Sequence, residues 1–195
     1  MPREGDPKDD KLKNEHLYKS ILATVLVVRR PINLTELAAL SVMPGSTSGN
    51  QDFLEELIST CGSFLTLRDR TLYFVHQSAK DFLLGNTSDE SSRKAFNWIF
   101  SSGIEEIHHI IFSRSLDAMS TMLRRDIYGL KAPGFPIAHV GVLNPDPLAA
   151  LRYPCVYWVD HLSASVSGDR GELYRDESFR NDGAVHTFLK TKYVY

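Results

Sequence analysis

The spacing of the apolar residues switches from alternating to helical in the middle of this chain, and the switch limits the folds that it can adopt. Between residues 64 and 75, apolar and polar side chains alternate on either side of a charged turn, which predicts a β-hairpin. From Gln77 to Leu84 the apolar residues recur at helical spacing, which predicts a short helix that ends at Gly85. His76 therefore stands where a strand gives way to a helix.

Three helical patterns precede the hairpin. The first covers residues 14–29 and stops before a proline. The second begins in "NLTEL", where either Asn33 or Thr35 can serve as N-cap, and ends at "MPG". The third is "QDFLEELISTC". Three helices followed by a hairpin predict a mainly α chain that contains a winged helix-turn-helix.

Polar segments divide the chain into three predicted parts. Residues 1–13 are charged and carry almost no apolar side chains, so we expect a disordered N-terminus. Residues 14–86 form the predicted winged-helix domain. Residues 87–195 form a predicted helical connector, whose last helical pattern runs up to the end of the chain. We therefore expect the connector to be truncated at its C-terminal end.

The predicted connector contains one long helix and several shorter ones. The long helix runs from about Gly103 to Arg125, and Ser102 with Glu105 predicts a capping box at its start. The segments "PLAALRYPCVYWVDHL" and "GAVHTFLKTKYVY" predict two more helices, the first of them started or kinked at Pro154.

The charge of the chain argues against nucleic acid and membrane partners. The formal net charge is -2 at pH 7, whereas proteins that bind phosphate backbones or anionic lipids carry a basic excess. The third helix bears Asp52, Glu55 and Glu56 and no Lys or Arg, so it would set carboxylates against the phosphates of a major groove. The longest apolar run, "ILATVLVV", is too short to cross a bilayer.

Cys61 and Cys155 lie far apart in a chain large enough to fold without disulfides. We expect both to be reduced thiols in a cytoplasmic protein.

Motifs for nucleotide binding and catalysis are absent from the sequence. It has no G-x-x-x-x-G-K-[ST], no G-x-G-x-x-G and no H-E-x-x-H. His108 and His109 are adjacent, so on a helix they point in different directions, and we expect a surface or capping role for them and no metal site. Ser78 follows His76 by two residues, but neither a G-x-S-x-G nor a matching acid accompanies them. We expect no catalytic residues and no enzyme activity.

His76 has two possible roles at the start of its helix. Ser78 could cap this helix through "SAKD", and the free N–H groups of a helix N-terminus favour a phosphate. His76 would then be a neutral donor to a phosphate oxygen. In the other interpretation, His76 packs at the junction and satisfies a backbone group.

Several long stretches carry a family resemblance, above all "YFVHQSAKDFLL", together with "ILATVLVVRRPINLTELAAL" and "IHHIIFSRSLDAMSTMLRRDIYGLKAPGFPI". In these stretches the chain resembles fungal NACHT-domain NLR-like proteins of the signal-transduction ATPase class, which include vegetative-incompatibility proteins. The likeness runs from about Leu17 to Tyr195. It implies a winged-helix domain plus the start of a helical connector, because this region of the family follows the NACHT core and precedes WD or ankyrin repeats.

The resemblance also implies a role for the junction histidine. In the wider NACHT family a histidine in an aromatic-x-His-x-Ser setting contacts the β-phosphate of ADP, and His76 matches it, with Phe74 and Ser78 in the flanking positions. The phosphate loop and the magnesium-binding acidic motif of the family are missing from this chain. We therefore expect ADP or ATP to be bound only together with a NACHT core, in cis or in trans.

The resemblance thus implies a non-enzymatic regulatory module that closes over an ADP-bound NACHT core and relays its state. Two alternatives remain open from the sequence. One is a free-standing adaptor that binds other NLR-like proteins, and the other is a winged-helix DNA-binding protein.

Overall fold

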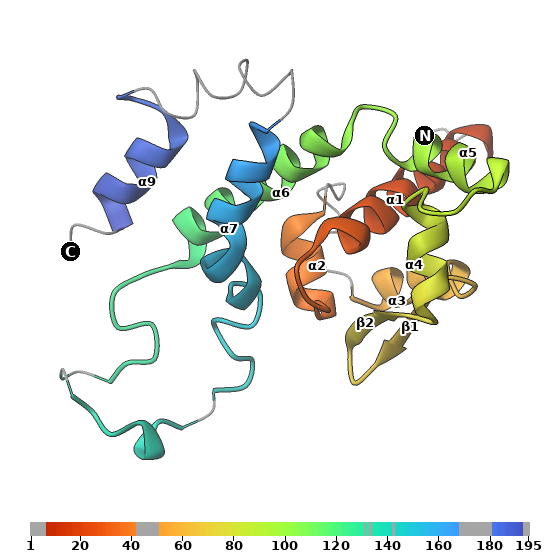
Figure 1. Ribbon diagram of the computed structural model, residues 1–195. Coiled ribbons are helices and arrows are strands. Elements are labelled where there is room, and N and C mark those ends of the chain that lie inside the picture. The colour runs from red at the N-terminus through yellow and green to blue at the C-terminus, as the bar shows by residue number, and fades with distance from the viewer. Residues whose placement is uncertain are drawn as a thin grey trace, which may run out of the picture.

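The computed structural model describes residues 7–41, 51–130, 132, 134–141, 143–167 and 181–192. Within these residues the chain is mainly α, as predicted, and its β structure is one two-stranded antiparallel sheet with an isolated bridge beside it. Helices α1 to α5 and the hairpin gather on one side of the molecule, and α6, α7 and α9 extend towards the other (Figure 1).

The first helices follow the predicted order. They are α1 (Pro7–Val27), α2 (Leu34–Leu40) and α3 (Gln51–Thr60). Helix α1 takes in residues 7–13, which the sequence assigned to a disordered N-terminus, and residues 1–6 lie outside the described residues. Proline is favoured in the first turn of a helix and acidic residues are favoured near its start, so the "PKDD" sequence suits this earlier beginning.

Helix α2 begins at one of the two predicted caps. The side chain of Asn33 accepts from the backbone N–H of Glu36, and the Glu36 carboxylate accepts from the backbone N–H of Asn33. This capping box confirms Asn33, and Thr35 lies inside the helix. The predicted stop at residues 43–45 lies outside the described residues, and α2 ends at Leu40.

The predicted hairpin is confirmed as β1 (Leu65–Arg68) and β2 (Thr71–Phe74), which pair with Leu67 opposite Leu72. Its turn residues Asp69 and Arg70 both have positive φ, as a tight two-residue turn requires. Residues 32–34 hold the other edge of β2, because Leu72 N–H donates to the Ile32 carbonyl and Leu34 N–H donates to the Arg70 carbonyl. The hairpin is therefore fixed to the start of α2.

Helices α4 (Gln77–Leu83), α5 (Glu90–Ile99) and α6 (Ile104–Met122) follow the hairpin. The capping box predicted for Ser102 and Glu105 is wrong. Gly103, with φ of 96°, is the N-cap of α6, and no side chain caps it. This shift of one residue puts Glu105 at the second helical position, whereas the capping box needs it at the third.

The remaining elements are a 3-10 turn, η1 (Ile137–His139), and the helices α7 (Arg152–Ser165) and α9 (Ala184–Lys192). Pro154 lies in the first turn of α7, where its missing N–H costs no helical hydrogen bond. Helix α7 packs along α6, and α9 packs on α6 as well (Figure 1).

The buried residues form two clusters that divide within α6. The first joins α1 to α5 and the hairpin to Ile111 of α6 and Tyr153 of α7. The second begins at Phe112 and joins the later part of α6 to α7 and α9. Helix α5 and the first turns of α6, which the sequence assigned to the connector, thus pack against the predicted winged-helix domain.

Candidate functional site

The imidazole of His76 is the N-cap of α4. Its Nδ1 accepts from the backbone N–H of Ser78 at 3.2 Å, and Nδ1 lies 2.8 Å from Ser78 Oγ. The sequence offered Ser78 as a possible cap, but the histidine side chain occupies that role. The strand-to-helix junction itself is where the sequence placed it: β2 ends at Phe74 and α4 begins at Gln77.

The capping contact determines which ring nitrogen of His76 can act on a ligand. A backbone N–H can only donate, so Nδ1 is an acceptor, and the neutral imidazole carries its proton on Nε2. The side chain is exposed, and no described residue hydrogen-bonds Nε2. His76 therefore presents an oriented N–H donor to the outside, which suits a phosphate oxygen.

The surface next to His76 combines apolar side chains with a lysine on α4. Val75 is 53% exposed and Tyr73 is 40% exposed. Lys80 lies on α4, four residues after His76, and the Lys80 Nζ is 5.8 Å from the centre of the Phe74 ring. The sequence analysis did not single out Lys80, although the i, i+4 spacing in "HQSAK" could have indicated it.

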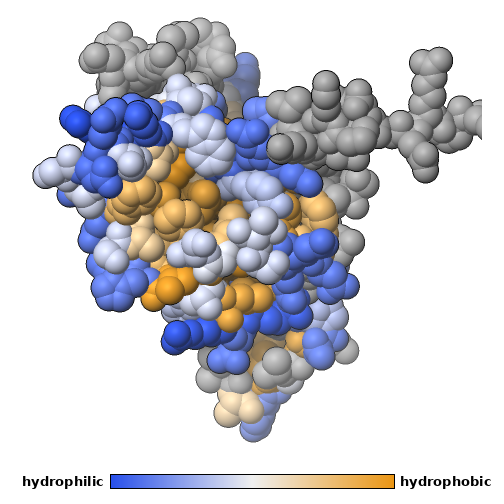
Figure 2. Space-filling view, turned by 90° about the vertical axis from the view of Figure 1, so that its right-hand side faces the viewer, coloured by the Kyte–Doolittle hydropathy of each residue, from blue (hydrophilic) through white to orange (hydrophobic). Residues whose placement is uncertain are grey.

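Apolar residues gather in the middle of the molecular face that carries α4 and α5, and hydrophilic residues surround them (Figure 2). Monomeric proteins seldom expose large contiguous apolar areas unless these take part in binding.

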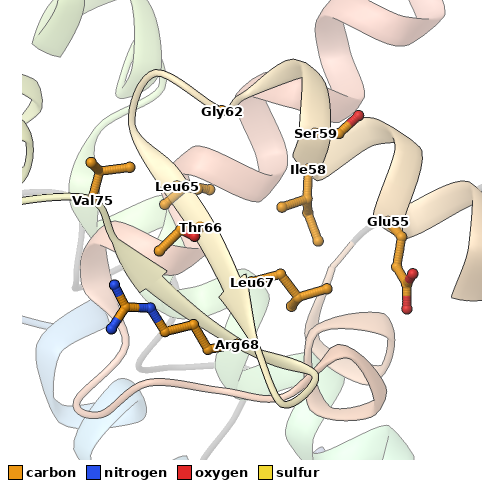
Figure 3. A pocket seen from close by; sticks show the side chains of 9 residues that line it. All are labelled: Glu55, Ile58, Ser59, Gly62, Leu65, Thr66, Leu67, Arg68 and Val75. Atoms are coloured by element: carbon orange, nitrogen blue, oxygen red, sulfur yellow. The ribbon is translucent and has the colours of Figure 1, made fainter.

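An open hollow of about 450 Å³ lies between α3 and β1 and extends to Val75. Figure 3 shows Ile58 and Leu67 pointing into the space between the helix and the strand. Glu55 and Arg68 are its charged lining residues, so the hollow has one basic side chain. One cation and one carboxylate are too little positive charge to hold a di- or triphosphate, so a phosphate at His76 needs further contacts from another domain or chain.

The close approach of His76 and Ser78 does not have the geometry of a nucleophile and its base. Nδ1 faces both the Ser78 hydroxyl and the Ser78 backbone N–H, and within the described residues no carboxylate orients the ring through Nε2. A triad needs an acid on the second ring nitrogen. The arrangement serves to cap the helix.

A buried network of polar side chains was missed by the sequence analysis. His108 of α6 and His161 of α7 are both buried, and their Nδ1 atoms lie 2.8 Å apart. His161 Nε2 lies 2.6 Å from the hydroxyl of Tyr153, which in turn accepts from the backbone N–H of Arg29 at 3.0 Å. The predicted surface or capping role is thus wrong for His108. The i, i+8 spacing of Tyr153 and His161 could have shown that both lie on one face of α7.

Burial controls the protonation of this His–His–Tyr network. Burial, with smaller contributions from repulsion by Arg29 and by a protonated His108, lowers the pKa of His161 to about 3. Burial and the charge of Arg29 also lower the pKa of His108, against an opposite effect of Glu105. Burial raises the pKa of Tyr153 to about 12. All three groups are therefore neutral at neutral pH.

An ion pair lies against the same network. Arg30 donates to both carboxylate oxygens of Glu36, at 3.0 and 2.6 Å, and its guanidinium carbon is 5.3 Å from the centre of the Tyr153 ring. Because Glu36 also closes the capping box of α2, it connects the end of α1 with the start of α2. Tyr153 extends this connection to α7.

The described residues hold neither a candidate metal site nor a candidate membrane span. No three His, Cys, Asp or Glu side chains there come together as metal ligands would. None of the helices described has the length and apolar character needed to cross a membrane.

Comparison with known proteins gives one informative match. No family model matches the chain, and no solved structure matches it significantly. The chain is 52% identical over 187 residues to the vegetative incompatibility protein HET-E-1 of Podospora anserina. This match covers 94% of the chain but 14% of the relative's length. The chain is thus related over nearly its whole length to a short stretch of a fungal vegetative incompatibility protein.

Proposed function

We propose that this chain is a non-enzymatic regulatory module of a fungal NLR-like switch, and that it closes over an ADP-bound NACHT core and holds that core inactive. Residues 14–86 act as a winged-helix domain and residues 87–195 as a helical connector. The observation that carries the proposal is the orientation of His76, whose capping contact leaves Nε2–H as a donor on the surface. The relationship to an incompatibility protein supports the same class of function.

The chain would contribute only part of the nucleotide site. His76 Nε2–H would donate to a phosphate oxygen, and Lys80, four residues later on α4, would add positive charge. ADP would supply the phosphate, held by the phosphate loop of the core. The hollow beside β1 has too little positive charge to hold it.

Closure would select between two nucleotide states. A ligand shifts an equilibrium only as far as it binds the two states differently, so the His76 contact must favour the ADP state over the ATP state. The exposed apolar side chains around the hairpin would pack on the core and make closure favourable in the absence of ATP. Exchange to ATP would release the module.

State-dependent binding to a separate core tests this function. We expect this chain to bind an isolated NACHT core of the fungal family more tightly, by about tenfold or more, when the core holds ADP than when it holds ATP. Isothermal titration calorimetry of the two nucleotide-loaded cores measures the difference. Equal affinity for both states would support the adaptor alternative, and no binding to either would reject both.

DNA binding is tested with the same protein sample. The exposed face of α3 carries Asp52 and Glu56, so we expect no shift of duplex DNA in a gel at low salt. A shift that disappears as the salt concentration rises would instead support the DNA-binding alternative.

A further inference from the structure

The network of His108, His161 and Tyr153 joins α6 and α7 to the residues that follow α1, at the point where the two buried clusters meet. His108 lies on α6, three residues before Ile111, which belongs to the first cluster. His161 lies on α7, next to Leu162 of the second cluster. Through Tyr153 both reach the backbone of Arg29, just beyond the end of α1. The contact therefore fastens α6 and α7 to the end of α1.

One proton arrangement satisfies the whole neutral network. The Tyr153 oxygen accepts from Arg29 N–H, and the Tyr153 O–H has a partner only if it donates to His161 Nε2. His161 then carries its proton on Nδ1 and donates to His108 Nδ1, which leaves the His108 proton on Nε2. Every donor between Arg29 and His108 has an acceptor.

An added proton breaks this order wherever it binds. If either histidine becomes doubly protonated, His161 Nε2–H must donate to the Tyr153 oxygen, and the Tyr153 O–H then has no acceptor among the described residues. If both histidines become doubly protonated, two N–H groups face each other across 2.8 Å. A buried donor without an acceptor destabilises the closed packing.

The charges around the pair do not compensate for such a proton. Arg29 and Arg30 come from the end of α1, and Arg30 is already paired with Glu36 of α2. Glu105 lies one turn before His108 on α6, and its carboxylate favours the charged form of His108. On α7, Tyr157 is another titratable group, and it acts on Tyr153. Helix α9 approaches α6 elsewhere, where Lys192 donates to the carbonyl of Leu123.

We propose that the His108–His161–Tyr153 network is a proton-sensitive latch that fastens α6 and α7 to the end of α1 when neutral and releases them when it takes up protons. The latch would couple the position of the helical connector to pH. It does not depend on the proposed nucleotide function, because His76 and α4 take no part in it.

The direction of the pH effect follows from the lowered pKa values of the two histidines. In the open state both imidazoles would return to a pKa of about 6.5, so the open state binds more protons than the closed state below that pH. The closed state is therefore fully favoured above about pH 6.5 and loses stability as the pH falls. The opening constant is the equilibrium ratio of the open to the closed state. As the pH falls from about 7.5 to about 5.5, each histidine that is neutral in the closed state but takes up a proton in the open state raises this constant roughly tenfold.

Hydrogen exchange of the α7 amides, corrected for the intrinsic pH dependence of exchange, measures the opening constant. From about pH 7.5 to about pH 5.5 we expect a rise of roughly tenfold to a hundredfold. His108→Gln keeps a neutral hydrogen-bonding side chain but removes one titrating group, so its rise should be smaller than that of the wild type, by up to about tenfold. His16→Gln, at an exposed position on α1, is the matched control and should behave like the wild type.

An equal pH response in His108→Gln and the wild type would overturn the latch, as would a wild type whose α7 exchange does not respond to pH. If His108→Gln does not fold, the imidazole ¹⁵N resonances of the wild type provide a second test, because they report the protonation state and the tautomer of each histidine. We expect His161 to stay neutral at about pH 5.5 in the closed state, with its proton on Nδ1. Titration of His161 with a pKa of about 6.5 and unchanged α7 protection would contradict the proposal.

Discussion

Glu36→Ala is expected to lower the free energy of unfolding by about 3 kcal/mol, because it leaves Arg30 without its partner and opens the capping box of α2. Glu36 is 1% exposed and accepts from the Arg30 guanidinium and from the backbone N–H of Asn33. The Arg30 side chain is 36% exposed, so water can partly solvate it. The loss of stability should therefore lie at the lower end of the range for breaking a buried ion pair. Urea denaturation measures the change.

An exposed ion pair provides the control for this substitution. Glu90 and Lys94 pair at i, i+4 on the surface of α5, and exposed pairs of this kind contribute little. Glu90→Ala should change the free energy of unfolding by no more than about 0.5 kcal/mol. Similar losses for Glu36→Ala and Glu90→Ala would show that burial adds nothing to the Arg30–Glu36 pair.

Phe112→Ala is expected to lower the free energy of unfolding by about 4 kcal/mol, and the lost stability should fall mostly on the second buried cluster. Phe112 is 1% exposed and stacks on Trp158 with 6.3 Å between the ring centres. Its removal leaves a cavity between α6 and α7 and near α9. Hydrogen exchange should therefore show a larger loss of protection in α9 and the C-terminal half of α7 than in α1 to α3.

Phe135 provides the comparison for Phe112. It lies in the loop between α6 and α7 and is 40% exposed, so Phe135→Ala should lower the free energy of unfolding by at most about 1 kcal/mol. If Phe112→Ala lowered protection equally in α1, α7 and α9, the two clusters would unfold as one unit, and the division within α6 would have no energetic meaning.

The sequence predicted those parts of the fold that depend on neighbouring residues. The capping box of Asn33 and Glu36, the hairpin and the start of α4 each follow from residues within a few positions of one another. The same local reasoning failed at Ser102, because the positive φ of Gly103 moved the helix start by one residue. A single-residue shift in backbone geometry leaves almost no trace in the spacing of side chains.

The two candidate sites differ in how far the sequence could predict them. The junction position of His76 follows from the change of spacing, but the sequence could not show that its own Nδ1 caps α4 and leaves Nε2 for a ligand. The contact of His108 with His161 joins residues 53 positions apart, and it depends on how α7 aligns along α6. Periodicity shows which face of a helix is buried but not which residue of another helix it meets.

The most direct test of the account is the effect of His76→Asn on ADP binding by a complex of this chain with a NACHT core. Asparagine is a good N-cap, so the variant should keep α4 intact while it removes the imidazole donor. We expect the wild-type chain to slow ADP release from the core. With His76→Asn, ADP release should be about tenfold faster than with the wild-type chain, because one charge-assisted hydrogen bond is lost. His16→Asn, at an exposed position on α1, should release ADP at the wild-type rate. Equal ADP release with wild-type and His76→Asn chains, both bound to the core, would contradict the proposed role of His76.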